Sequence, residues 1–167
     1  MVGPSPRSDV GVRSLKPTVD FYLVVCRFLR LPNLLTAASN VLMGGVISGA
    51  SGEDLFVAAA AAMALYGAGV GWNDLVDETR DRTLHPERPL PAGLLSRVQA
   101  WRIVGGLGGA GMLMAATLGG RAFVFGLGVA ASIAAYNLWA KSHQAWGPLA
   151  MALCRGFNVA MGLSLGA

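Results

Sequence analysis

Residues 55–81, LFVAAAAAMALYGAGVGWNDLVDETRD, join an apolar stretch to a run of acidic side chains. The apolar part ends at Trp72, carries no charge and is long enough to cross a hydrocarbon core of about 30 Å as a helix. If the helix continues, its pitch places four polar side chains within roughly 100° of one face. These are Asn73, Asp74, Asp77 and Asp81. Clustered carboxylates need cations, and hard oxygen ligands suit Mg²⁺ bridged to a phosphate group, so the stretch predicts a metal-diphosphate site at a membrane surface.

The composition of the whole chain is typical of a membrane protein. Hydrophobic residues make up 54% of the 167 residues and charged residues only 13%. Five stretches have the length of about 17–25 residues that a membrane span requires. They are Leu31–Ala50, Leu55–Trp72, Ile103–Gly120, Ala122–Ala140 and Trp146–Ala167. The predicted fold is all-α, a polytopic transmembrane helical bundle of about five spans.

The positions of the Lys and Arg residues indicate how the chain crosses the membrane. The net charge of +4 does not form one basic patch, so no nucleic acid is expected as a partner. Eleven cations fall on one side of the predicted spans and only Arg121 on the other. The eleven are Arg7, Arg13, Lys16, Arg27, Arg30, Arg80, Arg82, Arg88, Arg97, Arg102 and Lys141. The positive-inside rule then predicts a multi-pass protein, expected in a bacterial plasma membrane, with its N-terminus and acidic run in the cytoplasm.

The chain divides into a tail and one transmembrane domain. Residues 1–20 are expected to be a flexible cytoplasmic tail, and residues 21–167 the membrane domain, with a cytoplasmic Asp-rich loop at 73–102. Three prolines between residues 86 and 91 end any helix and favour extended backbone. Ser96 is a candidate N-cap for the next helix. Gly119-Gly120-Arg121 leaves room only for a tight turn, which predicts an antiparallel helix pair.

A lone arginine follows the acidic run. Arg88 lies in a segment stiffened by proline, which lowers the entropy lost when its guanidinium binds two phosphate oxygens in a fork. Taken alone, either the acidic run or this segment is explained by a charged cytoplasmic loop that pairs its own ions in water and sets topology.

Together the two motifs resemble a known family. Asn-Asp-x-x-Asp-x-x-x-Asp at residues 73–81, followed by Arg-Pro-Leu-Pro-x-Gly at residues 88–93, is similar to the first signature of the UbiA superfamily of intramembrane prenyltransferases. Residues 31–45 and 136–162 resemble the same family more loosely. Residues 139–158 look most like its UbiA-like EboC branch.

The resemblance implies a fold and a reaction. Family members are expected to form a ring of nine transmembrane helices with two facing Asp-rich motifs, to bind an isoprenyl diphosphate through Mg²⁺, and to transfer the prenyl group to an aromatic or other hydrophobic acceptor. By matching position, Asn73, Asp74, Asp77 and Asp81 would hold the metal, with the three aspartates catalytic. Arg88 and Lys141 would neutralise the diphosphate.

Three further residues are candidate substrate contacts. Arg155 and Asn158 lie one turn apart inside the last span, where a central arginine costs about 2.5–3.5 kcal/mol, so both are expected to face the bundle. They fit a structural hydrogen-bond network or a substrate contact. Tyr136 fits contact with the acceptor or anchoring at the membrane interface.

The second Asp-rich motif of the family does not occur in this chain, which has no acidic residue after Glu87. The chain is therefore expected to be the N-terminal half of a longer protein, to need a C-terminal half as partner, and not to catalyse transfer alone. A non-catalytic protein of the same fold that binds or moves an isoprenoid or precursor is the alternative. A cation-coupled transporter fits less well, because the aspartates lie at a helix mouth rather than at the membrane midplane.

Overall fold

The computed structural model describes residues 17–166, and this part of the chain is helical throughout, apart from its connecting turns. The predicted tail, residues 1–20, falls mostly outside the described residues. Six α-helices and two short 3₁₀ helices follow one another. They are α1 (Pro17–Phe28), α2 (Leu31–Ser48), α3 (Gly52–Leu84), α4 (Arg97–Thr117), α5 (Gly120–Leu138), η1 (Ala140–Ser142), α6 (Trp146–Leu163) and η2 (Ser164–Gly166). The all-α prediction is confirmed.

Helix boundaries follow local capping chemistry. The Ser51 side chain accepts a hydrogen bond from the backbone N–H of Asp54 at the start of α3. Ser96 and Gln99 form a complete capping box at the start of α4, so the predicted Ser96 cap is present. Gly49 ends α2 with φ of 75°, a left-handed conformation that glycine adopts without strain. The predicted tight turn at residues 119–121 is also present, and α4 and α5 pack against each other.

The acidic run is helical. Helix α3 continues without interruption to Leu84, so residues 73–102 are not one loop. Only residues 85–96 connect α3 to α4. The prediction of extended backbone there was wrong, because the segment folds into successive turns. In these turns Ala92 donates its backbone N–H to the carbonyl of Arg88, and Leu94 donates to that of Pro89.

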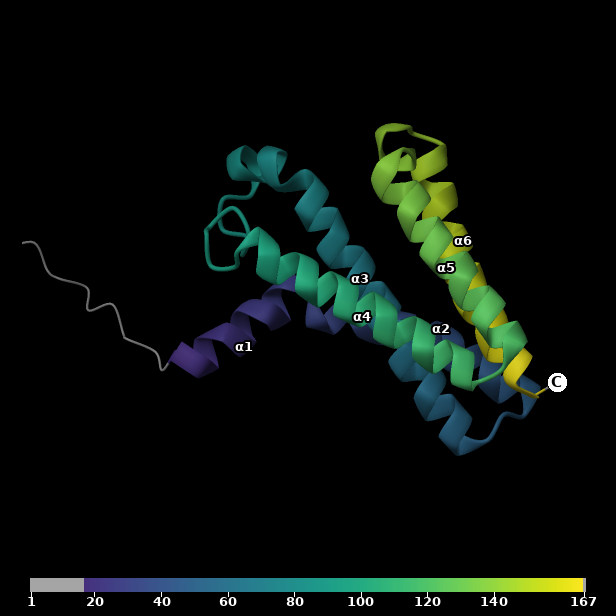
Figure 1. The fold of residues 1–167 in the computed structure, drawn as a ribbon. Coiled ribbons are helices and arrows are strands. Elements are labelled where there is room, and N and C mark those ends of the chain that lie inside the picture. Colours follow the sequence, from purple (N-terminus) through teal and green to yellow (C-terminus); the bar gives the residue numbers. More distant parts are fainter. Residues whose placement is uncertain (1–16, 167) are drawn as a thin grey trace, which may run out of the picture.

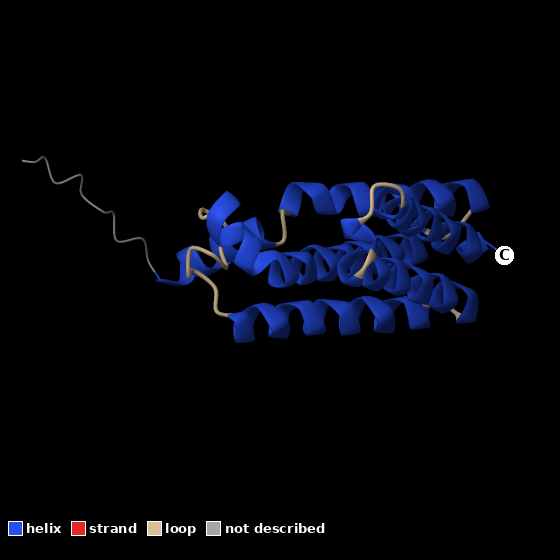
Figure 2. Ribbon diagram, turned by 90° about the horizontal axis from the view of Figure 1, so that it is seen from above, coloured by secondary structure: helices blue, strands red, loops and turns tan. Residues whose placement is uncertain are grey.

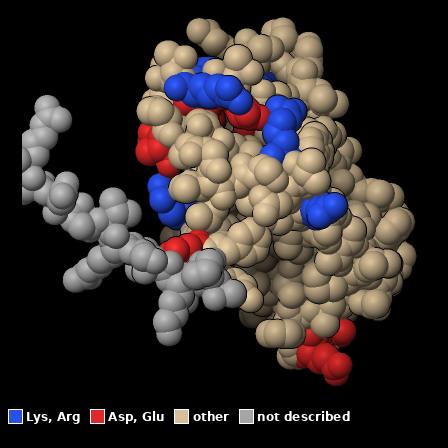
Figure 3. Space-filling view, turned by 60° about the vertical axis from the view of Figure 1, so that its left-hand side comes forward, with Lys and Arg blue, Asp and Glu red and all other residues tan. Residues whose placement is uncertain are grey.

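Four helices are long and apolar enough to cross a membrane: α2, α3, α5 and α6 together with η2. Helix α4 is also long enough to cross a membrane, but it is less apolar than these four helices because its first turns carry Arg97, Gln99 and Arg102. Five long helices thus form where five spans were predicted. Figure 3 shows acidic and basic side chains gathered at the upper end of the molecule, with a broad, mostly uncharged surface below them.

The long helices pack side by side, as the view from above shows (Figure 2). Helix α3 packs along α4 and α2, while α5 and α6 form a second pair that leans away from α3 and α4 at one end (Figure 1). The two groups join through α2 and α6, which approach closely at Gly44 and Gly162. A Cβ atom on either glycine would collide with the backbone of the facing helix.

A buried apolar cluster anchors the 85–96 segment. Leu90 and Leu95 of this segment are 5% and 2% exposed and pack with Phe28, Leu75 and Val104. Burial of these side chains stabilises the turn structure against the helices beneath it. The residues between the cluster and the end of α3, including Arg88, are therefore held in place.

Candidate functional site

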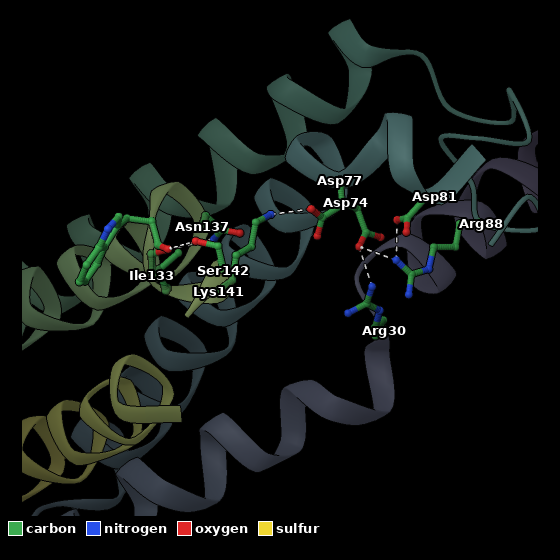
Figure 4. A network of polar contacts seen from close by, with 10 residues as sticks. Arg30, Asp74, Asp77, Asp81, Arg88, Ile133, Asn137, Lys141 and Ser142 are labelled. Atoms are coloured by element: carbon green, nitrogen blue, oxygen red, sulfur yellow. Dashed lines mark hydrogen bonds and ion pairs between the residues drawn. The ribbon is translucent and has the colours of Figure 1, made fainter. Parts of the chain in front are cut away.

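Three aspartates at the C-terminal end of α3 are each paired with a cation from a different segment (Figure 4). Arg30, between α1 and α2, lies 2.6 Å from Asp74. Arg88 of the 85–96 segment lies 2.5 Å from Asp81. Lys141, in η1, lies 2.6 Å from Asp77. The three cations thus balance the clustered negative charge that the sequence predicts. Along the chain they lie 44, 7 and 64 residues from their aspartate partners.

Arg88 bridges two of the carboxylates. Its Nη1 atom donates to Asp81 and also lies 3.8 Å from Asp74. The side chain is 28% exposed, so it is partly buried between the two carboxylates and the surface. Arg88 thus lies beside the acidic run, on a segment that buried leucines hold in position, and its contact with a diphosphate stays a prediction.

Arg30 also belongs to the candidate site, although the sequence predicts it only as a positive charge that sets membrane topology. It has a left-handed backbone with φ of 50° and ψ of 54°, which is uncommon for a residue with a side chain. This conformation turns the chain from α1 into α2, and the guanidinium donates to Asp74. The sequence feature that marks this turn is Pro32, two residues after Arg30, because proline favours the first turn of a helix.

The environment shifts the pKa values of two acids in the charged end of α3, beyond its apolar stretch. Burial raises the pKa of Asp74, which is only 4% exposed, while Arg30 and Arg88 act in the opposite direction. The hydrogen bond from Arg82 lowers the pKa of Glu78.

Glu78 belongs to a separate ion-pair group. It accepts hydrogen bonds from Arg82, one turn further along α3, and from Arg97 at the start of α4, at 2.9 and 2.7 Å. Because its partner Arg97 belongs to α4, Glu78 joins the two helices that pack along each other.

A cavity of about 200 Å³ begins at Asn73, the residue before Asp74. We call it the polar cavity because two arginines and four asparagines line it, among apolar residues that form much of its wall. Arg30 and Asn73 line it, and so do all three candidate contacts of the later helices, Tyr136, Arg155 and Asn158. Tyr136 is half-buried in the wall, whereas Trp139 and Trp146 nearby are exposed. The structure thus brings the substrate-contact candidates together around one cavity, and their role in binding stays a prediction.

Two buried amide oxygens in the wall of this cavity have no hydrogen-bond partner among the described residues. They belong to Asn137 and Asn158, each 3% exposed. The Asn137 amide nitrogen donates to the Ile133 carbonyl, which leaves its oxygen facing elsewhere. An unsatisfied buried acceptor costs free energy.

The aspartate and asparagine oxygens are of the type that Mg²⁺ prefers. Within residues 17–166, however, no three His, Cys, Asp or Glu side chains approach closely enough to hold an ion. Each aspartate is engaged by its cation instead. The donor set therefore fits the metal chemically, and metal binding would require these ion pairs to rearrange.

The fold and the site define an integral membrane protein whose paired acids and cations adjoin a polar cavity within a helical bundle. Residues 34–166 match the UbiA prenyltransferase family. The chain belongs to this family, as its two sequence motifs predicted. The search of curated proteins gave no match. The resemblance to the EboC branch stays a prediction.

Solved structures with the same fold include enzymes and ligand complexes. A digeranylgeranylglyceryl phosphate synthase superposes with a TM-score of 0.84 at 20% identity, over 89% of this chain and 54% of that one. A UbiA homologue from Archaeoglobus fulgidus bound to GPP and Mg²⁺ gives 0.78 at 21% identity, over 86% of this chain and 54% of that one. The same homologue bound to DMAPP and Mg²⁺ gives 0.78 at 21%, over 85% and 54%. The chain therefore spans about half the length of the structures it resembles.

Proposed function

We propose that this protein binds an isoprenyl diphosphate together with Mg²⁺ and takes part in transfer of the prenyl group to a hydrophobic or aromatic acceptor. The observation that carries the proposal is the meeting of three aspartates with three cations from separate segments beside a polar cavity. The complexes of the Archaeoglobus fulgidus homologue with GPP or DMAPP and Mg²⁺ support the choice of ligand. This chain would supply one side of the site, and the second Asp-rich motif would come from a C-terminal half.

The residues of the site have distinct roles in this proposal. Asn73, Asp74, Asp77 and Asp81 offer the oxygens for the metal, which when bound would stabilise negative charge on the diphosphate. Arg88 and Lys141, together with Arg30, exchange carboxylate contacts for phosphate oxygens. Arg88 is suited to this exchange because its planar guanidinium forms two parallel hydrogen bonds.

The acceptor would occupy the polar cavity. Its wall contains Tyr136, Asn137, Arg155 and Asn158. A few polar groups in a mainly apolar wall would orient an acceptor by hydrogen bonds. Tyr136, Arg155 and Asn158 are therefore proposed as substrate contacts.

A binding experiment tests the proposal. The protein in its full natural length, reconstituted in nanodiscs, should bind a non-hydrolysable thiolodiphosphate analogue of geranyl diphosphate with Mg²⁺ and lose that binding in EDTA. Undiminished binding in EDTA contradicts the proposal. Transfer is assayed separately with pooled aromatic acceptors, and Mg²⁺-dependent binding with no transfer to any of them would favour the non-catalytic alternative.

The orientation of the site is also a proposal. The count of eleven cations on one side against one on the other supports a cytoplasmic location for the charged end of α3. In a background with Cys26→Ser and Cys154→Ser, Thr83→Cys should be protected from an impermeant thiol reagent on intact cells, and Gly52→Cys should be labelled. Labelling at position 83 alone would reverse the orientation.

A further inference from the structure

Helix α1 packs on the bundle through its C-terminal end. Its last residue, Phe28, is fully buried in a cluster with Leu90 and Leu95, and Val24 packs at the edge of this cluster. Figure 1 shows the helix extending outwards from the bundle instead of running along the long helices. The earlier turns of α1 therefore lie away from the protein core.

Three large apolar side chains are exposed in the earlier part of α1. Phe21 is 43% exposed, Tyr22 70% and Leu23 53%. Phe21 and Tyr22 meet edge to face, with their ring centroids 6.4 Å apart. We call these three residues the apolar patch of α1. Apolar surface left in water costs about 25 cal/mol for each Å², so the patch is stabilised by an apolar neighbour.

The position of α1 in the chain indicates what this neighbour is. Only Leu29 and Arg30 separate α1 from α2, a candidate membrane span that begins at Leu31. The left-handed backbone of Arg30 turns the chain at this point. Helix α1 thus lies where α2 leaves the membrane, at the boundary between hydrocarbon and water. A tyrosine such as Tyr22 is favoured at this depth, because its ring contacts acyl chains while its hydroxyl group reaches water.

The C-terminal end of α1 is joined to the segment that carries Arg88. The Arg27 guanidinium donates a hydrogen bond of 3.0 Å to the backbone carbonyl of Glu87, the residue before Arg88. Phe28 packs against the buried leucines of the same segment. The position of the 85–96 segment therefore depends in part on where α1 is held.

We propose that the apolar patch of α1 binds the interfacial region of the lipid bilayer, among headgroups and upper acyl chains, and that this attachment stabilises the position of the 85–96 segment through Arg27 and Phe28. Lipid holds one end of α1, and the other end holds the segment beside the aspartates. The patch is distinct from the polar cavity, and its contact with lipid requires no bound diphosphate. A second copy of the chain and a further part of the protein are the other occupants that the experiment separates from lipid.

The first test measures what surrounds the patch. A nitroxide is attached at Tyr22→Cys in the full-length protein, with Cys26→Ser and Cys154→Ser, in phosphatidylcholine vesicles. Electron paramagnetic resonance measures its collisions with oxygen, which concentrates in hydrocarbon, and with a water-soluble nickel chelate. The balance of the two at position 22 should lie between those of two controls. These are Ile47→Cys on the span α2, where the native side chain is likewise 70% exposed, and Thr83→Cys beyond the apolar part of α3.

Two results overturn the lipid contact. A nitroxide at position 22 that meets the nickel chelate as often as one at position 83 lies in water. A nitroxide that is shielded from both reagents is covered by protein, either by a second copy or by a further part of the chain.

The second test measures whether the patch stabilises the segment. A nitroxide at Leu94→Cys, a position of the segment that is 51% exposed, reports local mobility through its line shape. Replacement of all three patch residues by serine should narrow the lines. Arg27→Met, which keeps most of the side-chain length and removes the donor to the Glu87 carbonyl, should narrow them too. Two matched controls change an exposed residue elsewhere, Ile47→Ser in α2 and Arg80→Met in α3, and should leave the line shape unchanged.

The outcomes are distinguishable. Narrowing in the triple serine variant supports the proposal, and the Arg27→Met spectrum then shows whether the hydrogen bond or Phe28 transmits the effect. An unchanged line shape in the triple serine variant overturns the stabilising role, even if Arg27→Met narrows the lines. Equal narrowing in the two controls also overturns it, because the effect is then a general loss of rigidity. No ligand enters either measurement, so absence of Mg²⁺-dependent diphosphate binding overturns the proposed function alone.

Discussion

Two sets of carboxylates on the same end of α3 have different partners. Cations from three segments pair with Asp74, Asp77 and Asp81, which lie near the polar cavity and which we call the aspartate set. Glu78, on the neighbouring edge of the helix, pairs with Arg82 of its own helix and Arg97 of α4. The aspartate set would have to open its ion pairs to admit a ligand, whereas the glutamate pairs join two helices that pack along each other. Position on a helix alone does not assign a carboxylate to a site.

The largest expected difference between the two sets is in ligand affinity. Asp81→Asn should weaken Mg²⁺-dependent binding of the geranyl thiolodiphosphate by about 100-fold, because a charge-assisted interaction worth up to about 3 kcal/mol is lost. Glu78→Gln should change it by less than about twofold. Titration of both variants in nanodiscs measures the contrast. Equal losses would place Glu78 in the site.

A smaller effect is expected from the cations. Arg88→Lys should reduce the same affinity by about tenfold, since an ammonium group cannot form the two parallel hydrogen bonds of a guanidinium. Arg97→Lys is the matched control, because among the described residues Arg97 forms its ion pair with Glu78 alone. If Arg88→Lys binds as tightly as the native protein, Arg88 acts only on the structure of the loop.

Lys141 should contribute less than Arg88, because it contacts one aspartate and is a point charge. Lys141→Gln should lower affinity by about fivefold, equivalent to about 1 kcal/mol, and Lys141→Arg should restore most of it. The readout is the Mg²⁺ concentration needed for half-maximal binding as well as the ligand affinity. No change in either quantity would leave Lys141 as a structural partner of Asp77.

The smallest expected effect lies on the structural side of the comparison. Glu78→Gln should lower the free energy of unfolding by about 1 kcal/mol or less, because Arg82 and Arg97 are 68% and 58% exposed and solvent screens their pairs. Thermal unfolding in detergent, followed by circular dichroism, measures the change. A loss of stability several times larger would show that the α3–α4 contact depends on this residue.

The sequence by itself determined the membrane class, the Ser96 cap and the turn at residues 119–121, whereas it assigned the aspartates to a loop that the structure shows as the end of α3. These features depend on interactions between residues a few positions apart: the length of an apolar stretch, the pitch of a helix and the capping of its ends. The family resemblance rested on the same local spacing, and the match over residues 34–166 confirmed the family.

Only the tertiary structure decided which cation meets which carboxylate. From the sequence, Arg30 is only a topology charge, and Lys141 is a phosphate partner only by resemblance to the family. Their aspartate partners follow from the packing of α2 and α5 against α3. Such contacts join residues about 40 to 65 positions apart, and their geometry follows from helix crossing and side-chain packing, which no short stretch of sequence encodes.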